Sequence, residues 1–250
     1  MSALLTQLLP GGGPVRQDSA PGQADPWDSG MWPLHRADWL GDPADWRNDA
    51  AVVVLGPEAA EDAMHVPFTL DATGVGAVER IVVTIDYSPI PQVLTFWPGR
   101  ARPLLGFGVK YESGSPLRAS VQRAGGGWRM GAHYVSATGG GCTAPAAAHG
   151  QPDWQEGFGE MRARLWPDTG RLRVWLRHPQ DTGLAPGIAA HHLTEMVLED
   201  DAGQIARLEL HAPVEENPAL TFLLPEEVSG PVTIRARDTM GYRFAGEVAA

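Results

Sequence analysis

The chain of 250 residues contains a single cysteine, Cys142, so no disulfide can form within it. It also lacks any run approaching the roughly 18 apolar residues of a membrane-spanning helix. Positive charge is scarce: 19 Lys and Arg stand against 30 Asp and Glu, giving a formal net charge of −11. Nucleic acids and anionic membrane surfaces both select a basic face, so this balance argues against either as a partner.

Glycine and proline are abundant, with 30 and 22 residues, while hydrophobic residues make up 43% of the chain. The hydrophobic content is sufficient for a substantial core. Frequent turn residues favour many short strands over long helices. A chain of this length can form one large domain or two domains of roughly 100 residues each.

The first half reads as a series of strands. Seven short runs rich in β-branched and aromatic residues are each bounded by Gly, Pro or Asp. No convincing amphipathic helix separates them, which predicts an antiparallel sandwich over residues 31–136. The runs cover residues 51–55, 66–70, 80–86, 92–97, 104–111, 117–122 and 128–135.

The second half shows a cleaner alternation. Leu172, Val174 and Leu176 share one face of a predicted strand, and arginines occupy the other. The same period of two recurs within residues 206–210, 220–224 and 232–236, and a last strand is expected near 242–248. This pattern predicts a second sandwich over residues 154–250, so the expected fold class is all-β with two sandwich domains.

Residues 1–30 are rich in Gly, Pro, Asp and Ser, which predicts a disordered or processed segment. Trp32, Trp39 and Trp46 follow at a spacing of seven residues. Nearby prolines leave room for one short helix at most. We interpret this aromatic segment as an apolar cover packed on a sheet, with a partner-binding surface as the alternative.

Cys142 lies in a Gly/Ala/Pro linker, residues 137–153, between the two predicted sandwiches. Gly139, Gly140 and Gly141 precede it directly. Glycine resists ordering, so the sequence predicts a flexible arm that holds the thiol out in solvent. A lone thiol on such an arm suits the covalent attachment of a group that is presented to other proteins. The residues therefore favour a noncatalytic carrier over an enzyme.

A cysteine hydrolase is the enzymatic alternative. It would need a histidine base beside the thiol, and His133, His149 and His178 match no protease spacing. A flexible arm is also a poor mount for a nucleophile, which requires preorganisation. No Lys or Arg close in sequence would activate Cys142.

His191 and His192 raise the question of a metal site. Adjacent residues of a strand point to opposite faces, so this pair alone cannot chelate one ion, although His178 and His211 could complete a set. We interpret these histidines as surface or interface residues and predict no metal and no cofactor.

Two acidic clusters are predicted to lie in solvated turns. Residues 199–201 precede Ala-Gly, and Glu215 and Glu216 precede Asn-Pro, both of which are turn signals. Neither cluster is accompanied by a second feature that indicates acid–base chemistry.

Several segments together resemble the SoxY and SoxZ families of bacterial sulfur oxidation. In the first half these are residues 61–67 (EDAMHVP), the turn 88–91 (SPIP) and the Gly-Gly-Cys ending at Cys142, which are similar to SoxY. In the second half, residues 178–183 (HPQDTG), 216–218 (ENP) with the following Thr221-Phe222, and 238–244 (DTMGYRF) resemble SoxZ in the family order. The whole chain is similar to the fused SoxYZ-like carriers associated with quinoprotein (PQQ) dehydrogenases.

This resemblance implies two immunoglobulin-like sandwiches and a carrier that holds a sulfur-containing group on Cys142, with Gly139 to Gly141 as its hinge. It implies sulfur-oxidising or quinoprotein and cytochrome enzymes as partners, and a periplasmic location with a misassigned or trimmed start. A structural or adaptor subunit of a quinoprotein dehydrogenase system, with Cys142 incidental, is the alternative. One departure is that SoxY ends just after its cysteine, whereas here the chain continues through residues 143–145.

Overall fold

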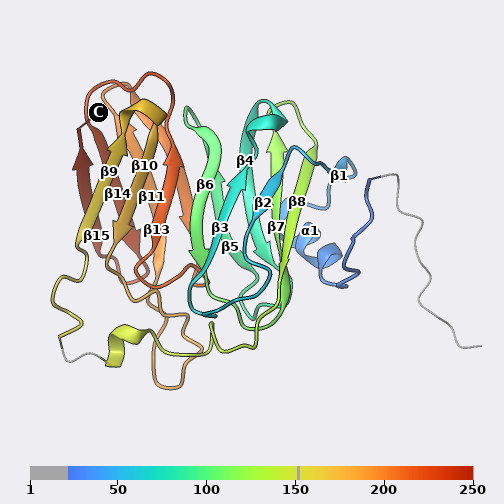
Figure 1. Cartoon of the computed structure of the whole chain (residues 1–250), viewed down its shortest axis with the longest axis horizontal. Helices are drawn as coiled ribbons and strands as arrows, with labels where there is room; N and C mark the ends of the chain where they lie inside the picture. The colour runs from blue at the N-terminus through green and yellow to red at the C-terminus, as the bar shows by residue number, and fades with distance from the viewer. Residues whose placement is uncertain (1–21, 151–152, 250) are drawn as a thin grey trace, which may run out of the picture.

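The computed structural model describes residues 22–150 and 153–249, and in this part of the chain two sheets form a β-sandwich (Figure 1). The larger sheet has nine strands in the order β1-β8-β7-β4-β5-β12-β11-β14-β15. The smaller has six, in the order β2-β3-β6-β13-β10-β9. Apart from the parallel pair β1 and β8, neighbouring strands are antiparallel.

The strands of the first half are β1 (Trp46–Asn48), β2 (Val53–Leu55), β3 (Val66–Asp71), β4 (Val78–Ile85), β5 (Gln92–Trp97), β6 (Arg102–Val109), β7 (Ser115–Arg123) and β8 (Trp128–Val135). Those of the second half are β9 (Met161–Trp166), β10 (Arg171–Leu176), β11 (Leu193–Asp200), β12 (Gly203–Leu210), β13 (Ala219–Leu223), β14 (Val232–Asp238) and β15 (Arg243–Val248). The helical segments are α1 (Trp32–Leu40) and the short 3-10 turns η1 (Thr73–Val75), η2 (Ala147–Gly150) and η3 (Pro167–Thr169).

Both sheets run continuously from one half of the chain into the other. In the larger sheet β5 pairs with β12, and Leu94 lies opposite Leu210. In the smaller sheet β6 pairs with β13, and Leu105 lies opposite Phe222. Figure 1 shows the result, with the blue-to-green half and the yellow-to-red half side by side along shared sheets. We call the line along which these strand pairs meet the seam.

The strands form where the sequence alternates apolar and polar side chains. In β10, Leu172, Val174 and Leu176 are fully buried, whereas Arg171 and Arg173 are exposed. The period of two follows from the pleat, which sends successive side chains to opposite faces. Buried residues of both halves belong to one continuous hydrophobic core.

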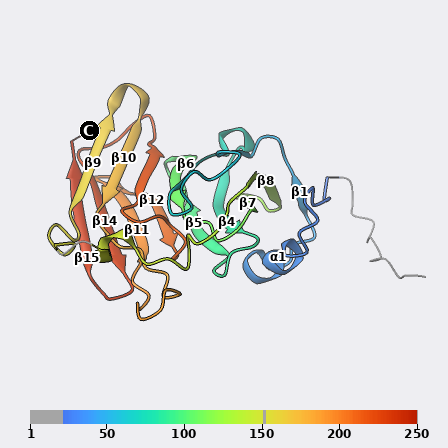
Figure 2. The same ribbon diagram turned by 60° about the horizontal axis from the view of Figure 1, so that its bottom comes forward.

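A smaller apolar cluster lies beneath α1. Trp32 and Trp46 pack edge to face, with ring centroids 5.4 Å apart, against Val82, Trp128 and Met130. Figure 2 shows α1 beside β1, at the far end of the nine-stranded sheet. The predicted apolar cover is therefore confirmed for Trp32 and Trp46, which are almost completely buried.

Residues 22–30 pack against the larger sheet instead of being disordered. Arg118 is fully buried on β7, binds Asp86 through two nitrogens at 2.8 and 2.6 Å, and reaches Asp25 at 2.9 Å. Its guanidinium also lies over the rings of Trp27 and Trp32. Burial opposes the charged form of Asp86, but the nearby His35 ring and the hydrogen bonds from Arg118 and Ser29 outweigh it and lower the pKa of this carboxyl to about 2. Residues 1–21 lie outside the described part of the chain.

The predicted all-β sandwich fold is confirmed, and all seven runs predicted in the first half are strands. The expected hairpin at residues 199–201 joins β11 to β12. The sequence analysis assigned no run to β1, β9 or β11. The division into two domains stays a prediction, and the structure adds that the two segments share both sheets.

The helices of the described residues are short. The longest, α1, has nine residues, and none combines the length and apolar character needed to cross a bilayer.

We predict that damage at the seam weakens both halves together. Phe222 is 1% exposed and contacts Phe96 of the other half, with ring centroids 6.2 Å apart. Phe222→Ala should lower the free energy of unfolding by about 3–5 kcal/mol. Hydrogen exchange followed by mass spectrometry should show reduced protection in both β4 and β10. The exposed-site variant Glu247→Ala serves as the control, and loss of protection confined to the second half would contradict the prediction.

Candidate functional site: the arm that carries Cys142

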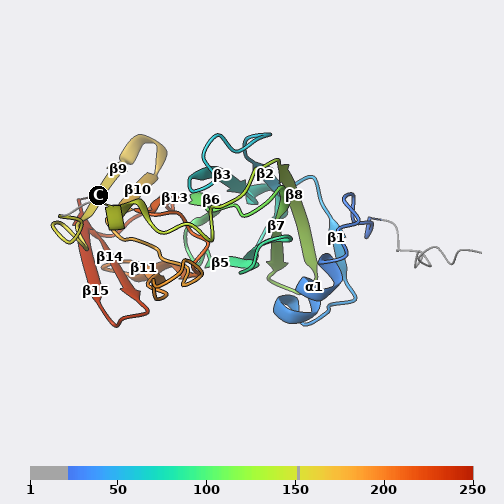
Figure 3. The same cartoon turned by 90° about the horizontal axis from the view of Figure 1, so that it is seen from below.

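The segment between β8 and β9 crosses the seam at one end of the sandwich. Figure 3, which views the molecule from below, shows it running from β8 across to the short turn η2 beside the second half. Cys142 lies in a turn closed by a hydrogen bond from the Ala144 amide to the Gly140 carbonyl, 3.0 Å long. We call residues 139–149 the arm.

The Cys142 thiol is buried, with 0% of the residue exposed. Its Sγ lies 3.7 Å from the Lys110 carbonyl oxygen and 4.0 Å from the Ser88 hydroxyl. Burial raises the pKa of this thiol to about 11, since the hydrogen bond from Ser88 only partly offsets the loss of solvation and Glu112 adds a repulsive charge. The expectation of a solvent-exposed thiol is therefore wrong for this conformation, because the arm folds onto the seam and turns the side chain inward.

Polar groups from both halves hold the main chain of the arm. From the first half, Glu112 accepts hydrogen bonds from the amides of Cys142, at 3.0 Å, and Thr143, at 3.2 Å. From the second half, the Thr182 hydroxyl donates to the Cys142 carbonyl at 2.6 Å. Asp181 accepts from the Ala146 amide, and Glu216 accepts from the amides of Ala147 and Ala148 at 2.7 and 3.1 Å.

Lys110 adds a buried positive charge where the halves meet. It is 1% exposed, and its ammonium donates a hydrogen bond to the Gln180 carbonyl across the seam. Burial lowers the pKa of Lys110, while the nearby charges of Asp181 and Glu216 oppose that shift. No basic residue near Cys142 in sequence indicated such a group, but the fold brings one to it.

The glycines before Cys142 have a packing role in this conformation. Gly139 and Gly140 have φ angles of 106° and 92°, which favour glycine. A Cβ on Gly141 would lie 2.2 Å from the Ala63 carbonyl oxygen and 2.5 Å from that of Tyr111. Gly141 also donates its amide to the Tyr111 carbonyl at 2.9 Å. Their predicted role as a flexible hinge stays a prediction.

Segments that are far apart in the sequence converge on the arm. Residues 61–67 supply the Ala63 carbonyl beside Gly141, and residues 88–91 supply the Ser88 hydroxyl beside the thiol. Residues 178–183 and 216–218 hold the main chain and are joined to each other, since the Asn217 amide donates to the His178 carbonyl at 2.9 Å. These are the segments whose resemblance to known families the sequence analysis noted.

None of the histidines considered as a catalytic base contacts the thiol in the described residues. His133 lies 3.0 Å from the Pro57 carbonyl, and His149 pairs with Asp181 at 2.8 Å. His178 pairs with Asp238 at 3.3 Å. The described part of the chain therefore holds no Cys–His pair of the kind that activates a cysteine nucleophile.

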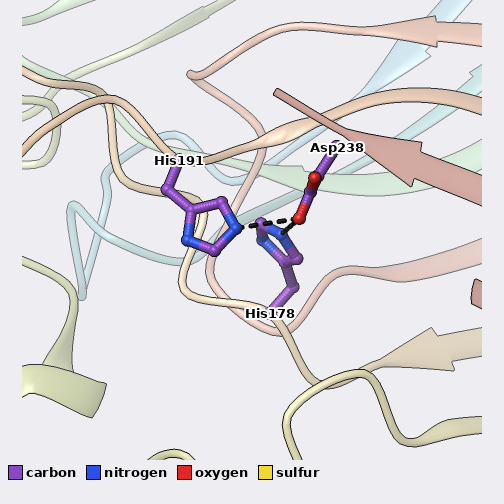
Figure 4. A group of neighbouring side chains, drawn as sticks. All are labelled: His178, His191 and Asp238. Atoms are coloured by element: carbon purple, nitrogen blue, oxygen red, sulfur yellow. Dashed lines mark hydrogen bonds and ion pairs between the residues drawn. The ribbon is translucent and has the colours of Figure 1, made fainter. Parts of the chain in front are cut away.

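His178, His191 and Asp238 form a compact cluster at the loop of residues 178–183, which holds the arm (Figure 4). One oxygen of Asp238 lies 3.3 Å from Nε2 of His178 and 2.8 Å from Nε2 of His191. The other oxygen accepts hydrogen bonds from the amides of Met240 and Tyr242, each 2.9 Å long. The cluster thus ties the end of β14 to the loop between β10 and β11.

Hydrogen-bond direction indicates that this cluster is not arranged for a metal ion. The Gln180 amide donates to Nδ1 of His178 at 3.1 Å, so Nδ1 carries the lone pair. In the neutral ring Nε2 then carries the proton and points it at Asp238. A metal on Nε2 would need the other tautomer and the loss of the Gln180 hydrogen bond. His192 is not part of this cluster. The absence of a metal site stays a prediction.

The sequence analysis assigned no contact with the arm to five residues of this site, although three of them lie in segments that it had noted for their resemblance. Glu216 was expected in a solvated turn but is only 5% exposed and holds two amides of η2. A signal was available for Lys110, a lone charge at the end of an apolar strand run. The five residues are Lys110, Glu112, Asp181, Thr182 and Glu216.

The fold and site thus define a two-sheet sandwich in which one buried thiol is held at the junction of two halves. Comparison with protein families extends this description. Residues 36–142, somewhat less than half of the chain, match the family described as sulfur oxidation protein SoxY. The matched segment ends on Cys142. No curated protein matches the chain.

Solved structures give weaker similarities. The chain is similar to the sulfur carrier protein SoxY from Chlorobium limicola f thiosulfatophilum, with 19% identity over 43% of this chain and 92% of that one and a TM-score of 0.39. It is also similar to a β-glycosidase from Bacteroides vulgatus, with 11% identity, 84% and 25% coverage and a TM-score of 0.23. A glucan utilization protein (SGBP-B) from Bacteroides ovatus gives 13% identity, 74% and 40% coverage and a TM-score of 0.21.

We predict that the native thiol reacts slowly. A pKa near 11, against the ordinary value of 9.0, lowers the thiolate fraction at pH 8 about a hundredfold. Alkylation of the native protein by iodoacetamide, followed by intact mass, should therefore be about a hundredfold slower than alkylation of the same chain unfolded in urea. Rates within about threefold of each other would contradict the buried, protonated thiol.

We also predict acid sensitivity centred on His178. Burial lowers its pKa to about 4, despite the hydrogen bond to Asp238 that favours the charged form. Between the ordinary value of 6.5 and this value the unfolded chain binds more protons, so stability is lost as the pH falls through that window. The loss from this group should reach about 3 kcal/mol, measured as the free energy of unfolding in urea.

His178→Gln should flatten that fall in stability between pH 7 and pH 4. The matched control is His65→Gln, because His65 is an exposed histidine on the other half. An equally steep fall in the His178 variant and in the unaltered protein would rule out this group as the cause.

Proposed function

We propose that this protein is a noncatalytic carrier that holds a sulfur-containing group covalently on Cys142 and presents it to redox enzymes. One observation carries the proposal: the family match to SoxY spans residues 36–142 and ends on the only cysteine of the chain. A carrier needs one attachment atom, and Cys142 is the one thiol that can serve.

The surroundings of the thiol support a carrier over an enzyme. Burial raises the pKa of Cys142, whereas a cysteine nucleophile needs a lowered one. No histidine among the described residues contacts the thiol to act as its base. Activation of Cys142 is therefore assigned to the partner that receives or loads the cargo.

Partners and compartment follow from the same proposal. Sulfur-oxidising enzymes, or quinoprotein and cytochrome enzymes, would load and unload the group, and the carrier would act in the periplasm. The second half would serve as the SoxZ-like partner of the first within one chain. Its support is the contact that residues 178–183 and 216–218 make with the arm.

The test is mass spectrometry of protein purified from its native host grown on a reduced sulfur compound. We expect sulfur or sulfur-oxyanion adducts on the peptide containing Cys142, removable by dithiothreitol, and none in a Cys142→Ser protein prepared in parallel. An unmodified thiol alone, both in that material and after incubation with partner extracts, would contradict the carrier function.

A second candidate is a structural or adaptor subunit of a quinoprotein dehydrogenase system in which Cys142 is incidental. The observation that favours it is the complete burial of the thiol, which is typical of structural cysteines. Under this alternative a host strain that carries Cys142→Ser would grow on a reduced sulfur compound as well as its parent. If the protein is a carrier, the same strain would lose the function of the protein and grow less well.

A further inference from the structure

Three carboxylates hold the backbone of the arm through hydrogen bonds. Glu112, Asp181 and Glu216 together accept hydrogen bonds from five amides, at positions 142, 143, 146, 147 and 148. Hydrogen bonds to a charged acceptor are stronger than neutral ones. These hydrogen bonds come from backbone amides and do not depend on side chains. The small residues of the arm can therefore form them.

The carboxylates that bind the arm come from both halves of the molecule. Glu112 follows β6 in the first half, while Asp181 and Glu216 lie in loops of the second half. Asp181 and Glu216 are only 4% and 5% exposed, so their carboxylates are shielded from competing water. The buried ammonium of Lys110 lies close enough to offset their charge.

Gly141 completes the closed conformation by steric fit. All three nearest atoms to a Cβ at this position are backbone atoms, between 2.2 and 2.7 Å away, and backbone cannot move aside as a flexible side chain can. Gly150 differs, because a Cβ there would meet nothing within 4 Å and its φ angle lies outside the left-handed region. Gly141 and Gly150 therefore form a matched pair for experiment.

A loaded thiol does not fit this conformation. The Cys142 residue has no exposed surface, and its Sγ already touches the Lys110 carbonyl and the Ser88 hydroxyl. A sulfur chain ending in an oxyanion would need several more atoms of space. It would also add negative charge beside Glu112, which already disfavours charge at this sulfur.

We propose that the arm is a two-state latch: Glu112, Asp181 and Glu216 hold it closed over the bare thiol, and an anionic sulfur group on Cys142 keeps it open. The identity of the cargo rests on the proposed carrier function. The closed state of the bare thiol does not, because it follows from the contacts of the arm alone.

The closed state is tested without any sulfur compound. Glu112→Ala removes two amide contacts and should raise the rate of Cys142 alkylation at least about tenfold. Gly141→Ala should do the same by steric clash. Hydrogen exchange at the amides of residues 142–148 should rise in both variants, while β10 and β14 keep their protection, which excludes general unfolding. Glu247→Ala is the control for the first variant and Gly150→Ala for the second.

Two outcomes would overturn the closed latch. One is fast exchange of the amides of 142–148 in the unaltered protein. The other is an unchanged alkylation rate in both Glu112→Ala and Gly141→Ala.

The open state is tested with tetrathionate. The Cys142 thiolate, its proton lost to buffer, attacks a central sulfur of tetrathionate, a new S–S bond forms, the central S–S bond breaks, and thiosulfate leaves. The product carries a thiosulfonate on Cys142, and no further oxidant is needed. In this adduct the amides of 142–148 should exchange as fast as in Gly141→Ala. Exchange as slow as in the bare protein would overturn the second half of the proposal.

The two hypotheses fail separately. If the native protein never carries sulfur on Cys142, the carrier function is lost, yet the alkylation and exchange results on bare thiol still stand. If the arm is open in bare protein, the latch is lost, while adducts on Cys142 in native material would still support a carrier.

Discussion

The pairing of β5 with β12 and of β6 with β13 is the constraint on which the rest of the structure depends. Main-chain hydrogen bonds along two strand pairs fix the register between the halves. That register brings the Lys110 ammonium of the first half to the Gln180 carbonyl of the second, and the Thr182 hydroxyl to the Cys142 carbonyl. The amides of the arm have their hydrogen-bond acceptors only when both halves are present, because the acceptors come from both. The environment of Cys142 is therefore a property of the joined halves, and of neither half alone.

The electrostatics of the seam explain why the Cys142 thiol is unreactive. Three carboxylates surround the arm, and Lys110 uses its buried ammonium on the Gln180 carbonyl. Loss of solvation and the charge of Glu112 disfavour a thiolate at Cys142, and they outweigh the opposing effects of Ser88 and Lys110. A thiol kept protonated and buried resists oxidation and alkylation, since the thiolate is the reactive form. In the proposed carrier, the features that would make Cys142 a poor catalyst would protect it as an attachment point between encounters with partners.

The strands were predictable from the sequence because burial on one face of a sheet imposes alternation, as Leu172, Val174 and Leu176 show. Two features could not be predicted. β11 has polar residues at positions packed between two other strands, so its alternation is diluted. Glu216 has turn neighbours typical of a solvated loop, but it is buried and its carboxylate accepts hydrogen bonds from the distant arm. Register across the seam likewise has no local signal, since it arises from pairing between segments about 100 residues apart.

The glycine run before Cys142 was predicted to be flexible, and the structure gives it a second physical meaning. Gly141 is required for close approach, and Gly139 and Gly140 adopt φ angles that other residues avoid. An arm anchored at both ends also has bounded reach: the six residues from 137 to 142 extend at most about 20 Å. Two exposed side chains lie near the closed site: Tyr87 precedes Ser88, the Leu184 amide donates to the Thr182 hydroxyl, and each of the two is at least 40% exposed. Ser88 and Thr182 both contact Cys142. In the proposed carrier, so short a reach would require a partner to approach this part of the surface closely, so opening of the arm and docking of the partner would act at one place.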